Sequence, residues 1–158
     1  MDVRIVNPFL AGTIRVLTTM ALIEPIPGKP FVKEDEFAIG TVSAIITISG
    51  DAAGTMALSF TDPCIRAIVR GLLGVDDNEV QQYVEDAVGE LTNMICGDAR
   101  ARLREEGFSL HAGIPSIIRG ERQRIEHSDN GPRLAIPFQT HYGQFMVEVV
   151  MSESVQIA

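Results

Sequence analysis

The stretch DDNEVQQYVEDAVGELTNMICGDARARLREEG, residues 76–107, decides the fold because its apolar residues recur with the period of one long helix. Asp76 and Glu79 have the spacing of a capping box, and their charge suits the positive end of a helix dipole. The predicted helix runs to about Glu106 and ends at Gly107. Its apolar side is formed by Val80, Val84, Ala87, Val88, Leu91, Ile95 and Ala99. We expect that side to be buried.

The opposite side of this helix carries a polar stripe. Counted at about 100° per residue, its members lie within about 80° of Glu90: Asp86, Glu90, Asn93, Gly97 and Arg100. Periodicity alone favours a solvated helix face. However, Asn and Gly weaken a helix interior by several tenths to about 1 kcal/mol each. An acid and an amide three residues apart, with a patch of bare backbone one turn further along the helix, would suit contact with another protein.

Two shorter helices are expected on either side of a pair of strands. Residues 8–22 form the first helix, which Asn7 caps and a proline opens. The second helix begins after a cap at Thr61 or Asp62 and ends at Gly74.

The remaining segments predict an antiparallel sheet. Five of them have the apolar and β-branched composition of strands: 41–49, 55–60, 112–119, 133–139 and 144–151. Glycine-containing turns at 50–54 and 141–143 form hairpins, and residues 120–132 form a polar loop. The order of helix, strands, two helices and strands predicts a single α+β domain over residues 1–158, with an antiparallel sheet packed against helices.

The composition excludes several classes of protein. The 158 residues are 46% hydrophobic and 22% charged, which is typical of a folded domain and excludes disordered, collagen-like and coiled-coil chains. The formal net charge is −8, and the sequence pI is near 4.8. An anionic surface repels phosphate backbones and acidic lipid headgroups. We therefore expect neither nucleic acid nor a membrane as a partner.

The cysteines and histidines show no pattern of a metal or redox site. Cys64 and Cys96 lie among apolar neighbours without CxxC spacing, so we expect small core residues in a reducing cytoplasm. His111, His127 and His141 are far apart and lack metal-ligand spacing, which predicts surface or structural roles. The N-terminal sequence lacks the apolar run of a signal peptide, and no stretch approaches the roughly 18 apolar residues of a membrane span. These features predict a cytoplasmic location.

The polar stripe has a counterpart in a known family. Residues 86–97, DAVGELTNMICG, resemble the phosphatase signature of the CheC, CheX and FliY family of bacterial chemotaxis. That signature is Asp or Ser, three residues, Glu, two residues, Asn and a later Pro. Residues 6–10, VNPFL, 18–21, TTMA, and 54–60, GTMALSF, also resemble CheX members, so the likeness covers nearly the whole chain. CheC-type members carry two signatures and this chain has one, which makes CheX the nearer relative.

The resemblance implies a role for each residue of the signature. The family's reaction is hydrolysis of the aspartyl phosphate on a response-regulator receiver domain, such as that of phosphorylated CheY. Asn93 would hold the attacking water, and Glu90 would pair with the receiver's active-site lysine. Asp86 would extend the contact, and Gly97 would allow close approach, with a packing glycine as the equal alternative. Pro115 corresponds to the later proline, one residue nearer to Asn93 than in the family pattern, and is a weak member of the predicted site.

The resemblance also implies a cofactor and partners. The receiver brings its own Mg²⁺, so this chain would need no metal of its own. CheX relatives are typically homodimers joined through their sheets, and the last predicted strand fits because Phe145 and Val147 face one way while Met146 and Val150 face the other. The alternative function is non-catalytic docking of a receiver or flagellar-switch component by the same fold. The acid–amide pair favours catalysis, because docking alone requires no amide there.

Overall fold

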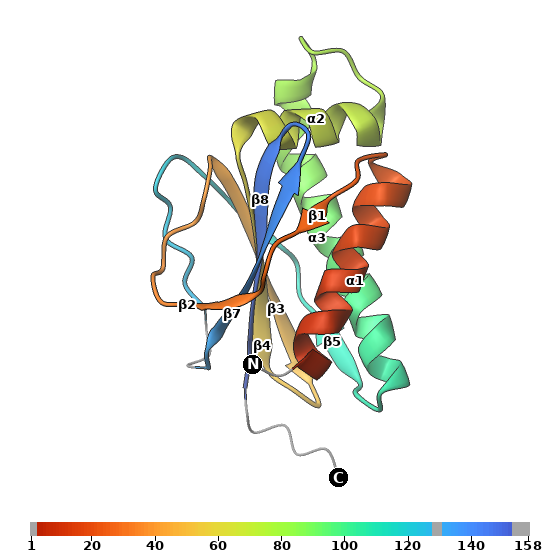
Figure 1. Ribbon diagram of the computed structural model, residues 1–158, viewed down its shortest axis with the longest axis vertical. Helices are drawn as coiled ribbons and strands as arrows, with labels where there is room; N and C mark the ends of the chain where they lie inside the picture. Colours follow the sequence, from red (N-terminus) through yellow and green to blue (C-terminus); the bar gives the residue numbers. More distant parts are fainter. Residues whose placement is uncertain (1–2, 128–130, 153–158) are drawn as a thin grey trace.

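The computed structural model describes residues 3–127 and 131–152, which form one antiparallel sheet of eight strands and three helices (Figure 1). The strand order is β1-β7-β8-β4-β3-β5, with β2 also paired to β7 and β6 to β3. The elements are α1 (Val3–Met20), β1 (Ile26–Pro27), β2 (Phe31–Lys33), β3 (Val42–Gly50), β4 (Gly54–Phe60), α2 (Asp62–Leu73), α3 (Val80–Glu105), β5 (Leu110–Ala112), β6 (Ser116–Arg119), β7 (Arg133–Thr140) and β8 (Gly143–Met151). Figure 1 shows α1 and α3 side by side along one face of the sheet. The predicted α+β class is therefore confirmed.

Two hairpins form the centre of the sheet. β3 pairs with β4 and β7 with β8, while Leu58 of β4 lies opposite Val147 of β8. On the face toward the helices, the rings of Phe60 and Phe138 stack on either side of Phe145, with centroids 5.4 and 4.7 Å from it. This face forms the hydrophobic core. Both hairpin turns predicted from glycine-containing segments are confirmed.

Helix α3 is the long helix that the sequence predicts, and its C-terminal end is confirmed. It begins without a side-chain cap, so the predicted capping box of Asp76 and Glu79 is wrong. The Asp77 carboxylate instead accepts a hydrogen bond from Arg70 Nη1 of α2 at 2.9 Å. This contact draws the acidic segment toward α2 and away from the first turn of α3.

Helix α1 begins earlier than the sequence predicts. Pro8 lies inside it, so Asn7 is no cap and the boundary predicted at residue 8 is wrong. Pro8 removes one backbone hydrogen bond from the helix. The additional N-terminal turn, however, buries Val6 in the same core as Phe9. Because burial of such a side chain contributes about 1.5–3 kcal/mol, it offsets the missing bond.

Asp98 links α1 to α3. Its carboxylate accepts hydrogen bonds from Arg15 Nη1 of α1 at 2.7 Å and from Arg102 Nε of α3 at 2.6 Å. The two helices approach closely here, since a Cβ on Gly12 would lie 3.1 Å from Asp98 Oδ1. Together with burial of the apolar side, these contacts orient α3 about its axis.

The strand predicted over residues 112–119 is two short strands. β5 and β6 both pair with β3, and residues 113–115 interrupt them. The Gly113 N–H still donates to the carbonyl of Thr47 at 2.9 Å. Pro115 has no N–H with which to continue the ladder, and the interruption follows from that.

The sequence analysis does not predict β1 and β2. Both strands pair with the outer edge of β7. They belong to a segment that contains Pro25, Pro27 and Pro30, whose prolines exclude a helix. An edge strand tolerates prolines because it needs hydrogen bonds on one side only.

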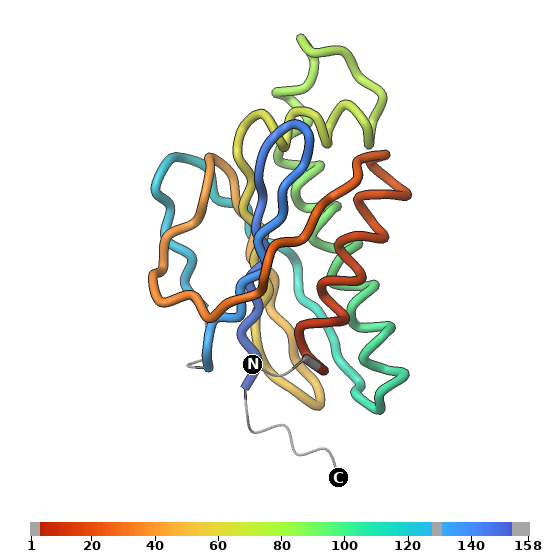
Figure 2. Tube along the Cα trace, in the orientation of Figure 1, coloured from red at the N-terminus to blue at the C-terminus, as the bar shows by residue number. Residues whose placement is uncertain are grey.

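Two segments, residues 34–41 and 120–127, cover the face of the sheet opposite the helices. Figure 2 shows them side by side, away from α1 and α3. The Ala38 N–H donates to the carbonyl of Gln123 at 2.8 Å, which joins the two segments. We refer to them together as the sheet cover.

The sheet cover corrects the polar loop predicted for residues 120–132. Gln123 and Ile125 are buried, so residues 120–127 pack as part of the fold, while residues 128–130 lie outside the described part of the chain. The same cover explains why Val150 is buried on the second face of β8. The two-sided burial of the last strand therefore arises within this chain.

Candidate functional site

The predicted polar stripe lies on the solvent side of α3. Asp86, Glu90 and Asn93 are exposed, and Gly97 is half-buried. The opposite side of the helix packs against α1, α2 and the sheet, and every apolar residue predicted for that side is buried. We call the four residues Asp86, Glu90, Asn93 and Gly97 the α3 stripe.

Glu90 and Asn93 lie on successive turns of the stripe, about 60° apart around the helix. No hydrogen bond or ion pair links either side chain to another residue in the described part of the chain. By contrast, the buried hydroxyl of Thr92 donates to the carbonyl of Val88 at 2.7 Å. The acid and the amide of the stripe are therefore available to a partner.

Gly97 leaves bare backbone at the end of the stripe. Among the described residues, a Cβ at this position would meet only Arg100 Nη2, at 4.0 Å. Packing within the chain therefore does not require a glycine here. This observation favours close approach by another molecule over the alternative of a packing glycine.

Arg100 departs from the stripe on which periodicity places it. Its Nη1 donates to the carbonyl of Leu110 in β5 at 3.4 Å, and the residue is half-buried. The guanidinium group thus ties α3 to β5 and is no part of a solvated face.

Pro115 lies half-buried in the connection between β5 and β6. Both strands contact α3. β6 approaches it at Gly89, where a Cβ would lie 3.8 Å from Ile117 Cδ1, and β5 approaches it at Arg100. The connection therefore runs beside the helical turns between these two contacts, which include the turn of Asn93.

A second polar cluster, which the sequence analysis missed, lies on the opposite face of the sheet. Glu148, only 1% exposed, accepts a hydrogen bond from Lys33 Nζ at 3.2 Å and lies 3.4 Å from His127 Nε2. The other ring nitrogen of His127 is paired with the Thr55 hydroxyl. The available signal was a carboxylate within the apolar run of the last strand. Each charged group of this Glu148 cluster has an internal partner that offsets the cost of its burial, and the contacts of His127 join the sheet cover to β4 and β8.

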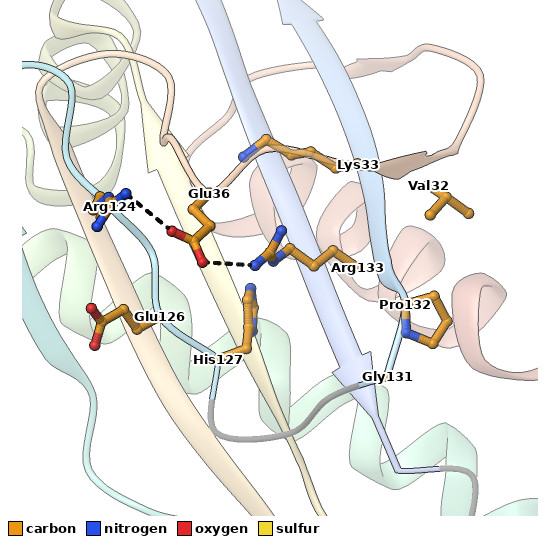
Figure 3. A pocket seen from close by; sticks show the side chains of 9 residues that line it. All are labelled: Val32, Lys33, Glu36, Arg124, Glu126, His127, Gly131, Pro132 and Arg133. Atoms are coloured by element: carbon orange, nitrogen blue, oxygen red, sulfur yellow. Dashed lines mark hydrogen bonds and ion pairs between the residues drawn. The ribbon is translucent and has the colours of Figure 1, made fainter.

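Figure 3 shows a pocket beside the Glu148 cluster, in which Glu36 lies between Arg124 and Arg133. The Glu36 carboxylate oxygens are 3.6 Å from Arg124 Nη2 and 3.3 Å from Arg133 Nη2. Glu126 adds a further negative charge to the lining. The two carboxylates balance the two guanidinium groups, and Glu148 balances Lys33, which also lines the pocket, so no excess charge remains to select an ion.

Cysteine and metal-ligand groups form no second constellation in the described part of the chain. Cys64 and Cys96 are buried, as predicted, and burial raises the pKa of the Cys64 thiol to about 11, so its nucleophilic thiolate is scarce near neutral pH. No group of three or more His, Cys, Asp or Glu side chains among residues 3–127 and 131–152 is arranged to hold a metal ion. None of the described helices combines the length and the apolar content that a membrane span requires.

The sequence and the fold both match known proteins. The sequence model of the family Chemotaxis phosphatase CheX matches residues 42–139, more than half of the chain. The CheY-P phosphatase CheX of Thermotoga maritima is 26% identical over 127 residues, which are 80% of this chain and 82% of that protein.

Solved structures give the same result over nearly the whole chain. A chemotaxis protein CheX from Desulfovibrio desulfuricans is 44% identical, with a TM-score of 0.88 over 94% of this chain and 99% of that chain. A chain of the CheX–CheY–BeF₃–Mg²⁺ complex from Borrelia burgdorferi is 26% identical, with a TM-score of 0.79 over 94% of this chain and 98% of that chain. With the signature residues exposed on α3, this chain belongs to the CheX family of chemotaxis phosphatases.

Proposed function

We propose that this protein hydrolyses the aspartyl phosphate of a CheY-type receiver domain in the cytoplasm. The observation that carries the proposal is the exposed pair of Glu90 and Asn93, which have no partner in the described part of the chain. Membership of the CheX family supports it. The Thermotoga maritima relative is a CheY-P phosphatase, and the Borrelia burgdorferi relative forms a complex with CheY, BeF₃ and Mg²⁺.

Asn93 is proposed to hold the attacking water. Hydrolysis of a phosphoryl group depends mainly on positioning, because the attacking and leaving oxygens must be in line. A carboxamide suits this task, since it offers a donor and an acceptor at fixed geometry without adding charge. Holding the attacking water in position, where it would otherwise be loosely bound, can lower the barrier to hydrolysis by several kcal/mol.

Glu90 is proposed to set the register of docking by pairing with the receiver's lysine. A carboxylate that binds an ammonium group makes a charge-assisted hydrogen bond, which fixes position as well as adding affinity. Asp86, one turn earlier, extends the anionic contact, and Pro115 supports the neighbouring connection. Under this proposal Glu90 moves no proton.

The first prediction separates the roles of Asn93 and Glu90. Asn93→Ala should retain binding to a BeF₃-loaded receiver in Mg²⁺ but lose about 10²-fold or more of the accelerated phosphate loss, because only the water is misplaced. Glu90→Gln should weaken binding about tenfold and make it less sensitive to salt. Single-turnover decay of the phosphorylated receiver and a binding titration measure the two effects.

Two exposed residues provide matched controls for these variants. Asn78→Ala removes an amide just before α3, as the control for Asn93→Ala. Glu85→Gln neutralises a carboxylate on α3 but off the stripe, as the control for the Glu90 variant. Both should behave as the wild type. Unchanged hydrolysis by Asn93→Ala would contradict the water-holding role. If the wild-type chain bound the receiver without accelerating loss of its phosphate, the result would instead indicate the alternative function, non-catalytic docking.

The second prediction concerns bare backbone at Gly97. Gly97→Ala should raise the free energy of unfolding by about 0.5–1 kcal/mol, because alanine is the better helix residue and has space here. The same variant should weaken binding of the loaded receiver, since a methyl group then lies in the interface. Gly89→Ala, off the stripe, should stabilise the helix similarly and leave binding unchanged. Equal binding by the two variants would exclude close approach at Gly97.

The third prediction concerns the metal. We propose that Mg²⁺ arrives with the receiver and that this chain binds none of its own, because an acid and an amide are too few ligands for it. Calorimetric titration with millimolar Mg²⁺ should reveal no saturable site. The chain alone should not hydrolyse p-nitrophenyl phosphate, because half of the active site is absent without the receiver. A tight Mg²⁺ site or brisk hydrolysis of this ester would make the active site self-contained and the proposal wrong.

The fourth prediction concerns assembly. We propose a homodimer joined through the sheets, as the resemblance to CheX implies. Among the described residues, the outer edge of β7 is covered only by the short β1 and β2, which expose Ile26, Phe31 and Val32. Light scattering at micromolar concentration should give about twice 17.2 kDa. A monomer throughout that range would refute the dimer without affecting the α3 stripe.

A further inference from the structure

Ile114 is the most exposed large apolar side chain in the described part of the chain, at 91%. It lies in the connection between β5 and β6, directly before Pro115. The other exposed large apolar residues belong to the ends of α1 and α2, to β1 and β2, to the sheet cover or to the β7–β8 turn: Met20, Leu22, Ile26, Phe31, Val32, Phe37, Leu73 and Tyr142. Ile114 therefore stands apart from every other exposed apolar group.

The connection holds Ile114 rigidly. On one side the Gly113 N–H donates to the carbonyl of Thr47 at 2.9 Å, and on the other Ser116 pairs with β3. The backbone is packed closely, because a Cβ on Gly113 would lie 2.7 Å from Thr47 Oγ1. Pro115 fixes its own φ and restricts Ile114 to extended conformations. Little backbone freedom therefore remains to be lost when this side chain binds a partner.

The connection is also level with the middle of the α3 stripe. β6 meets α3 where Ile117 faces Gly89, and β5 meets it where Leu110 accepts from Arg100. The helical turns between these contacts include that of Asn93. The connection that carries this exposed apolar group therefore runs along the part of α3 that presents the amide of the proposed reaction.

We propose that Ile114 is an apolar anchor that the receiver domain buries when it docks on the α3 stripe. This inference rests on the proposed function, because the occupant is the receiver whose phosphoryl group meets Asn93. The stripe itself offers two carboxylates, one amide and bare backbone, which give register and charge but little apolar area. Ile114, on the connection that runs beside the stripe, supplies that area, and its burial by the docked receiver would add to the affinity.

The test compares binding and turnover of Ile114 variants with a BeF₃-loaded receiver in Mg²⁺. The CheY-type receivers of the source organism are first screened for binding to the wild-type chain. Ile114→Ala should then bind about tenfold more weakly, whereas Ile114→Val, which keeps most of the apolar area, should stay within about threefold of the wild type. Leu22→Ala, which changes a side chain 80% exposed at the end of α1, is the matched control and should bind normally.

Turnover distinguishes an anchor from a structural or catalytic residue. For Ile114→Ala, the receiver concentration that gives half-maximal dephosphorylation should rise about tenfold, with the maximal rate within twofold of the wild type. Its thermal midpoint should not change, because the side chain is solvated. Binding by Ile114→Ala within twofold of the wild type would overturn the inference. If the wild-type chain bound the receiver without hydrolysing its phosphate, the proposed function would fail while the binding comparison would still decide the role of Ile114.

Discussion

Burial of one whole side of α3 is the constraint on which the rest of the structure depends. The 26-residue helix packs its apolar side against α1, α2 and the sheet, and each large side chain buried there contributes about 1.5–3 kcal/mol. Asn93 and Gly97 weaken the same helix by at most about 1 kcal/mol each. Core packing thus allows a helix-weakening site, and the Asp98 contacts with α1 hold that site toward solvent.

The elements that follow from local periodicity could be predicted from the sequence, and those that depend on distant partners could not. The hairpin around residues 50–54 and the span of α3 are correct because their patterns are self-contained. The missing N–H of Pro8 predicts a helix start, whereas burial of Val6 extends the helix on the N-terminal side of Pro8. β1, β2 and the sheet cover form only because β7 and β8 offer an edge and a face to them.

The candidate site could likewise be predicted only in part from the sequence. Helical periodicity alone places Asp86, Glu90 and Asn93 on one exposed side, but it cannot distinguish a binding surface from a solvated face. The resemblance to CheX supplied that distinction. The structure adds that no neighbour in the described chain requires a glycine at position 97, and that Arg100 turns toward β5, which a helical projection cannot show.

Polar groups on the two sides of the sheet differ in whether they have partners within the chain, and this difference supports the proposed site. On the covered face, the buried charges of Lys33 and Glu148 are paired with each other, as a low-dielectric site requires. On the helix side, Glu90 and Asn93 are solvated and have no partner among the described residues. Water satisfies them at no cost to folding, so a docking receiver can replace that water with its own groups. The buried Glu148 cluster is the more unusual feature of the structure. A reaction on another protein, however, requires exposed groups that have no partner within this chain.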